Sequence, residues 1–179
     1  MQSALLRSEV LAGTQSDAGE ETNTDGLATY LLFGMGTRNY ATDVSNVREI
    51  VDLAEIRPIP NAPHDVFGMI DLRSQSIPVI DLAARMQVEA TPETDARIIV
   101  FEFGTPDTLR CLGIIADRVI SVSEIATGNI ETLTHAISGW QGDGVVGVIR
   151  SGDMQSLVLR IEHYLNAPDL PGEFDFGDG

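Results

Sequence analysis

Short apolar segments separated by polar turns dominate the chain between residues 27 and 166. Alternating apolar and polar positions, with turn residues every few positions, are typical of half-buried strands. The clearest case is the segment 68–82, where two apolar runs flank the polar turn Ser74-Gln75-Ser76. This pattern predicts a buried β-hairpin with Arg73 at its tip. A guanidinium held beside such a turn offers a planar set of donors to a carboxylate or a carbonyl cluster.

The rest of the folded part has the same character, and helical signals are short, near residues 82–86 and 162–165. Many short strands with frequent turns favour a sandwich or small barrels over a layered fold of helices and sheets. The sequence therefore predicts an all-β fold class. A polar break at residues 87–95, which contains Pro92, predicts the boundary between two halves of the folded unit.

The two halves also resemble each other in sequence. The motif Val-x-Glu-Ile at residues 47–50 recurs at residues 122–125. The strand pair whose first strand ends at Arg73 is matched by a later pair whose first strand ends at Arg150, and a short helical signal follows each pair. A two-copy repeat of this size predicts paired small barrels and not a solenoid, whose repeats are shorter and more numerous.

Both ends of the chain lack this strand pattern. Residues 1–26 are polar and acidic, and residues 167–179 carry carboxylates without a basic side chain. Segments of this composition cannot bury enough apolar surface to become ordered. We predict a disordered acidic arm over residues 1–26 and an acidic tail over 167–179, on either side of a folded domain at 27–166.

Composition narrows the classes of partner. The 179 residues, of which 43% are hydrophobic, are enough to fill the core of one domain. The formal net charge of −16 argues against nucleic acid and anionic membrane as partners. No apolar run approaches the roughly 20 residues that span a bilayer, and the N-terminus lacks a signal-peptide pattern. We expect a cytoplasmic protein without direct membrane insertion.

Groups that carry chemistry are scarce. The chain contains no lysine, which excludes reactions that need an ammonium group. Cys111 lies in an apolar run and is predicted to belong to the core. The glycines of residues 142–147 precede a strand-like segment, so we interpret them as turn and bulge residues and not as a dinucleotide site. The histidines lie too far apart in sequence to suggest a metal site: His64, His135 and His163. We predict no catalytic residue, no cofactor and no metal.

The hairpin carries a recognisable motif. Gly-x-x-x-Leu-Arg followed by Pro-Val-Ile-Asp-Leu, within residues 68–82, resembles the signature hairpin of CheW-like coupling domains of bacterial chemosensory arrays. That family usually has Asn-Leu-Arg-Gly at the tip, whereas this chain has Asp71 and Ser74, an extra negative charge and a less permissive turn. The resemblance covers roughly residues 27–166. It implies two packed five-stranded SH3-like barrels with short helices.

The resemblance also implies a function. CheW-like proteins are non-enzymatic adaptors that couple a chemoreceptor's cytoplasmic tip to the regulatory domain of a CheA-type histidine kinase. In the family, the glutamate of Val-x-Glu-Ile and the arginine of Leu-Arg lie near the groove between the barrels, where the receptor tip docks. Val47, Glu49 and Arg73 match those positions, so the resemblance implies that they bind the receptor. The kinase contact is barrel against barrel, and its residues are unassigned here.

Three alternatives stay open from the sequence. Glu49 and Arg73 could form an internal ion pair that only joins two strands. An enzyme would need a nucleophile, an acid and a base, which the sequence does not suggest. The altered hairpin tip and the acidic ends favour a third interpretation, a CheW-like coupling component of a non-flagellar system such as type IV pili or surface sensing.

Overall fold

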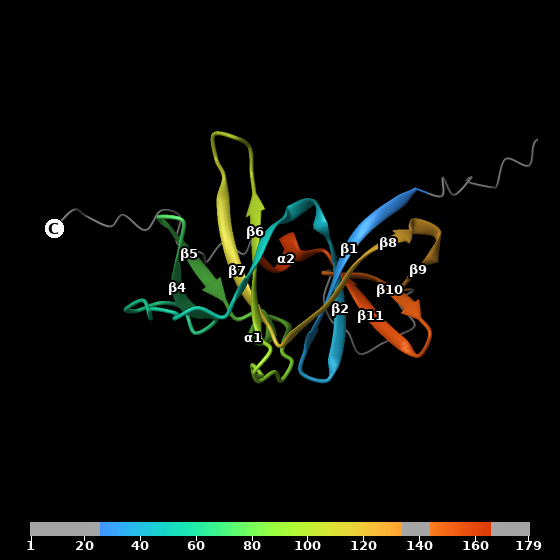
Figure 1. Ribbon diagram of the computed structural model, residues 1–179, viewed down its shortest axis with the longest axis horizontal. Helices are drawn as coiled ribbons and strands as arrows, with labels where there is room; N and C mark the ends of the chain where they lie inside the picture. The colour runs from blue at the N-terminus through green and yellow to red at the C-terminus, as the bar shows by residue number, and fades with distance from the viewer. Residues whose placement is uncertain (1–25, 134–143, 166–179) are drawn as a thin grey trace, which may run out of the picture.

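The computed structural model describes residues 26–133 and 144–165, and their strands form two sheets that lie along the long axis of the molecule (Figure 1). The six-stranded sheet contains, in spatial order, β8 (Arg118–Ala126), β1 (Leu27–Met35), β2 (Arg38–Asp43), β11 (Met154–Leu159), β10 (Val145–Ser151) and β9 (Ile130–Thr132). The five-stranded sheet contains β3 (Val47–Asp52), β6 (Arg97–Phe103), β7 (Arg110–Ala116), β5 (Gln75–Ile80) and β4 (Val66–Leu72). The helical elements are short: η1 (Val44–Asn46), α1 (Leu82–Met86), η2 (Thr127–Asn129) and α2 (Ile161–Leu165).

The two sheets share one topology once β9 is set aside. In each, an edge strand pairs antiparallel with the first strand of a hairpin: β3 with β6, and β8 with β1. The second strand of that hairpin then pairs in parallel with a strand of another hairpin: β7 with β5, and β2 with β11. The predicted all-β fold of two packed, related SH3-like barrels is confirmed. One sheet has the five expected strands, and β9 adds a sixth to the other.

The polar break at residues 87–95 does not separate the two sheets, contrary to our expectation. β5 precedes it and β7 follows it, yet both belong to the five-stranded sheet, where Val79 lies opposite Gly113. The chain changes sheet at η1 and again at Asp117, so β1 and β2 complete a sheet whose other strands come from the C-terminal part. The break is a loop packed against the turn between β1 and β2: a Cβ at Gly36 would lie 2.3 Å from the backbone oxygen of Glu89.

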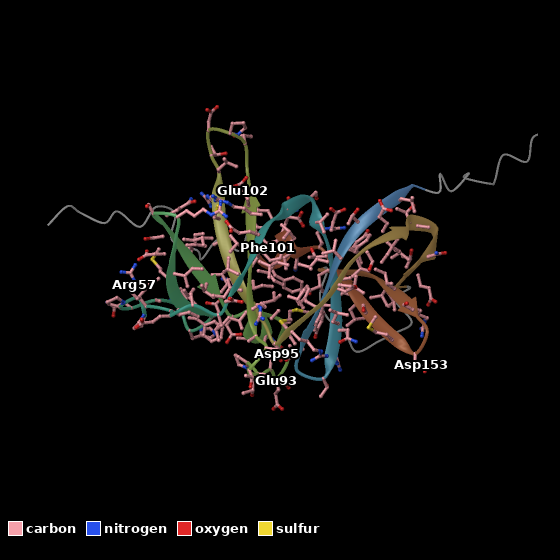
Figure 2. The ribbon with its side chains drawn as sticks, viewed as in Figure 1. Arg57, Glu93, Asp95, Phe101, Glu102 and Asp153 are labelled. Atoms are coloured by element: carbon pink, nitrogen blue, oxygen red, sulfur yellow. The ribbon has the colours of Figure 1, made fainter. Side chains whose placement is uncertain are left out.

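The described residues form three apolar cores. The largest lies between the sheets and combines side chains from both sheets and both helices, including Leu31, Phe33, Tyr40, Leu82, Ile99, Phe101, Ile114 and Leu165. Figure 2 shows Phe101 near the middle of the molecule. Smaller cores fill each barrel, one around Ile70, Ile77, Val79 and Ile98, the other around Leu32, Ala41, Ile149 and Val158. Burial of this surface is the main contribution that keeps the two barrels packed together.

Several sequence predictions concern residues outside the described ranges. The acidic arm over residues 1–26 and the tail over 167–179 fall there, except for Gly26, and so does His135. Within the described ranges, the segment after the glycines of residues 142–147 is strand β10, as predicted, with a register shift between Val145 and Gly147. A Cβ at Gly147 would lie 2.9 Å from the backbone oxygen of Glu131, so this glycine allows β9 to approach closely.

Candidate functional site

The tip of the β4–β5 hairpin is tighter than the sequence predicts. Leu72 pairs with Gln75, so the turn consists of Arg73 and Ser74 alone. Both residues have positive φ, 50° for Arg73 and 67° for Ser74, as a two-residue turn of this kind requires. Residues other than glycine, asparagine and aspartate rarely adopt this backbone conformation. The hairpin beneath it is held by Ile70, Ile77 and Val79, which are buried, and it therefore fixes the position of the strained turn.

Arg73 and Glu49 are brought together by the fold. Nη2 of Arg73 lies 3.2 Å from Oε2 of Glu49, on edge strand β3. The side chain of Arg73 is 74% exposed, whereas that of Glu49 is 19% exposed. Because β3 and β4 are the two edges of the five-stranded sheet, this ion pair connects the edge strand with the tip of the opposite hairpin. The pair does join two parts of one barrel, but it leaves most of the guanidinium open to solvent.

Val47, the third predicted residue, has a different environment. It pairs with Phe101 and packs, half-buried, against the core between the sheets. Its side chain therefore contributes to the edge of that core, while Glu49 and Arg73 form the charged part of the site. The placement of all three at a groove between the barrels stays a prediction, because the ion pair of Arg73 and Glu49 lies within the five-stranded sheet.

Arg48 also belongs to the charged site around Glu49 and Arg73, although the sequence analysis did not identify it. Its Nη1 donates to Oε1 of Gln75 at 2.9 Å and to Sγ of Cys111 at 3.0 Å. Nη1 also lies 3.5 Å from a carboxylate oxygen of Glu102, and Nε lies 3.7 Å from Oε1 of Glu49. The hydrogen bond to Cys111, helped by the two carboxylates, raises the pKa of Arg48 above its ordinary value. Arg48 therefore stays charged at any physiological pH.

Cys111 is buried, as predicted for a core residue. Its contact with Arg48 spans β3 and β7, which are not neighbours in the sheet, so no local sequence pattern could indicate it. Figure 2 shows Glu102 beside the base of the projecting β6–β7 hairpin, the element that also carries Cys111.

The extra negative charge at Asp71 has partners in the structure. Its carboxylate accepts hydrogen bonds from the guanidinium of Arg57 and from the hydroxyl of Ser76, the latter at 3.0 Å. Arg57 comes from the segment before β4 and forms an isolated bridge with Met69. The hairpin flank therefore carries a paired charge and not a free one.

Two features are absent from residues 26–133 and 144–165. No three histidine, cysteine or acidic side chains in these ranges are grouped so that they could hold a metal ion. None of the helices described there has the length and apolar character needed to cross a membrane.

Two packed β-barrels with a charged, solvent-exposed hairpin tip define a class of small double-barrel β-proteins. The model of the CheW-like domain matches residues 29–169 of this chain. The chain therefore belongs to the CheW-like domain family.

Individual relatives agree with this assignment. The chemotaxis protein CheW of Treponema pallidum is 34% identical over 142 residues, which are 78% of this chain and 83% of that protein. The chemotaxis protein CheW of Thermotoga maritima is 30% identical over 132 residues, covering 74% of this chain and 83% of its own length. The crystal structure of the scaffolding protein TtCheW from Thermoanaerobacter tengcongensis superposes with a TM-score of 0.68 at 26% identity, covering 80% of this chain and 96% of that one.

Proposed function

We propose that this chain is a non-enzymatic cytoplasmic adaptor that couples chemoreceptors to a CheA-type histidine kinase in bacterial chemotaxis. Its membership of the CheW-like family supports the proposal, since relatives bear the name chemotaxis protein CheW and one solved relative is described as a scaffolding protein. Such a protein acts by geometry: it holds two partners in a fixed arrangement. The kinase's regulatory domain binds barrel against barrel, and the receptor tip binds at the charged hairpin.

The presentation of Arg73 is the observation that carries the receptor contact. The guanidinium is held from one side by Glu49 at 3.2 Å, and its side chain is 74% exposed. Its remaining N–H donors are available to a carboxylate or carbonyl of the partner. A positioned arginine that loses its water at the centre of an interface is a typical hot spot. Glu49 and Val47 complete the proposed contact.

Binding of a purified receptor cytoplasmic hairpin fragment tests this contact. We expect Arg73→Ala and Glu49→Ala to weaken binding by about 1–3 kcal/mol, the range of interface hot spots, with no loss of the fold. The control is Arg150→Ala, because Arg150, on the β10–β11 hairpin, forms an exposed ion pair with Glu131 of β9. Titration calorimetry measures affinity and circular dichroism checks the fold. Unchanged affinity in both variants would overturn the receptor contact.

A coupling role in a non-flagellar chemosensory system is the second candidate. The tip differs from the family's usual Asn-Leu-Arg-Gly, and Asp71 is bound by Arg57 and Ser76. A hairpin tip with different charges and partners fits a receptor of a different signalling pathway. Co-purification from the native cell separates the candidates: pilus or surface-sensing components support the second, and flagellar chemotaxis components support the first.

A further inference from the structure

Arg48 connects the proposed receptor contact to the body of the five-stranded barrel. Its guanidinium lies against side chains of β3, β5, β6 and β7, in contacts of 2.9 to 3.7 Å with Glu49, Gln75, Glu102 and Cys111. Its side chain is 31% exposed, so most of it lies among these partners. An arginine with several fixed donors is well suited to hold several acceptors in one geometry.

The two oxygens of the Glu49 carboxylate face two different arginines. Oε1 lies 3.7 Å from Nε of Arg48, and Oε2 lies 3.2 Å from Nη2 of Arg73. Arg48 therefore attracts one oxygen and orients the carboxylate plane so that the other oxygen points toward Arg73. Without Arg48, Glu49 is free to choose other rotamers, and the anchor of Arg73 becomes less well defined.

Arg48 also holds the turn from its other side. Its Nη1 donates to Oε1 of Gln75 at 2.9 Å, and Gln75 is the first residue after the turn formed by Arg73 and Ser74. The tip is thus held twice by the same guanidinium, once through Glu49 and once through Gln75. Such double anchoring reduces the conformational entropy that Arg73 loses when it binds a partner.

The related barrel shows that the fold itself does not require a charge at this position. Arg48 occupies a bulge, since Val47 lies opposite Phe101 and Glu49 opposite Val100. The corresponding bulge in the six-stranded sheet is occupied by Ile120, because Val119 lies opposite Phe33 and Ser121 opposite Leu32. Ile120 packs against the core of its own barrel. An apolar side chain therefore serves the same backbone position in the barrel whose hairpin turn carries no arginine.

We propose that Arg48 is a positioning residue that pre-organises Arg73 for the receptor tip, acting through Glu49 and Gln75. This inference rests on the proposed function, because it concerns the same contact. It assigns a role to Arg48, the variable residue of Val-x-Glu-Ile. It also predicts that the effects of Arg48 and Arg73 on binding affinity are energetically coupled.

A double-mutant cycle with Arg48→Met and Arg73→Ala, read out as affinity for the receptor hairpin fragment, tests this role. Methionine keeps the apolar stem and removes the guanidinium. We expect Arg48→Met alone to weaken binding about threefold to tenfold, and to have little further effect once Arg73 is alanine. Arg150→Met is the matched control, since it removes one exposed arginine and should leave affinity unchanged at the same salt concentration.

A second, smaller substitution, Gln75→Ala, tests the same role with less risk of changing the fold. Gln75→Ala removes the 2.9 Å hydrogen bond from Arg48 and lies on the exposed end of β5. We expect about a twofold loss of affinity that disappears in the Arg48→Met background. Additive effects of Arg48→Met and Arg73→Ala, or no effect of either positioning variant, would overturn the inference. Unchanged affinity in both Arg73→Ala and Glu49→Ala would instead overturn the receptor contact itself.

Discussion

The β4–β5 and β10–β11 hairpins occupy equivalent places in the two barrels, yet only the first carries an arginine in its turn. Each has a two-residue turn, closed by Leu72 with Gln75 in one and by Ser151 with Met154 in the other. Figure 2 shows Arg57, beside the first hairpin, and Asp153, in the second turn, at opposite ends of the molecule. The same hairpin backbone therefore carries different side chains at the two ends of the molecule.

The strand register corrects the alignment that the sequence repeat indicates. Gly152, and not Arg150, occupies the place of Arg73, because each is the first residue of its turn. Arg150 corresponds to Asp71, two residues before the turn, and it pairs with Glu131 at 2.9 Å. The second tip therefore has no arginine at the turn itself. The two hairpins therefore share a backbone arrangement and differ in the side chains at their turns.

A second contrast lies where each hairpin meets its helix. In the five-stranded barrel, the backbone N–H of Asp81 donates to the carbonyl of Asp65, and in the other barrel that of Arg160 donates to Gly144. The side chains at these equivalent places differ. Nε of Arg85 donates to Oδ2 of Asp65 at 2.7 Å. At the second place, a Cβ on Gly144 would lie 2.4 Å from the ring of Tyr164. One barrel uses an ion pair where the other uses an aromatic ring against a glycine.

Truncation of equivalent core residues gives the largest expected effect and tests whether the two barrels contribute equally to stability. Phe33 and Phe101 are both fully buried in the core between the sheets. We expect Phe33→Ala and Phe101→Ala each to lower the free energy of unfolding by about 3–5 kcal/mol through lost burial and a cavity. Urea denaturation measures both. A much smaller loss for one of them would show that its barrel is not part of a common folding unit.

Removal of the Asp65 carboxylate has the next largest expected effect and is specific to the five-stranded barrel. Arg85 is 8% exposed and also donates to the backbone oxygen of Tyr164, so it connects α1 with α2. Asp65→Asn leaves this guanidinium without its carboxylate. We expect a loss of about 2–3 kcal/mol at pH 7. The control is Asp52→Asn, because Asp52 is 94% exposed in its pair with Arg97 and should contribute little.

The pH dependence of this loss has a definite sign. Partial burial raises the pKa of Asp65, but the hydrogen bond and charge of Arg85 outweigh it, so the net pKa is below the ordinary value of 3.8. The ion pair therefore stabilises the folded state fully above about pH 4, and its contribution is lost as the pH falls through the lowered pKa. The difference between the wild-type protein and Asp65→Asn should shrink toward pH 3 in denaturation experiments. A difference that stays constant would contradict the ion-pair explanation.

Exchange of turn residues gives the smallest expected effect, with opposite signs at the two tips. Ser74 has φ 67° without being glycine, whereas Gly152 has φ 59° and open space around the position of a Cβ. We expect Ser74→Gly to stabilise the protein and Gly152→Ala to destabilise it, each by about 0.5–1 kcal/mol, because only glycine adopts this conformation without strain. Thermal denaturation measures both changes. The same sign at both tips would show that the two turns are not equivalent.

The sequence alone determined the β class, the hairpin of residues 68–82, the buried cysteine and the family motif around Arg73. These follow from local patterns: alternation decides which side chains face inward, and turn residues decide where strands end. The repeat also indicated two related barrels. Its alignment was off by two residues at Arg150, because a sequence motif does not report which residues lie opposite each other in a sheet.

Only the tertiary structure decided how the strands are shared and which charges meet. β1 and β2, from the N-terminal part of the chain, lie in the same sheet as β8 to β11 from the C-terminal part. The other sheet contains strands from both sides of the polar loop at residues 87–95, so this loop does not separate the barrels. The partners of Arg48 come from three other strands, and Asp71 is paired with Arg57 from a separate segment. Such contacts depend on the packing of distant elements, which alternation along the chain does not encode. For that reason the sequence located the arginine at the tip, and the fold supplied the groups that hold it in place.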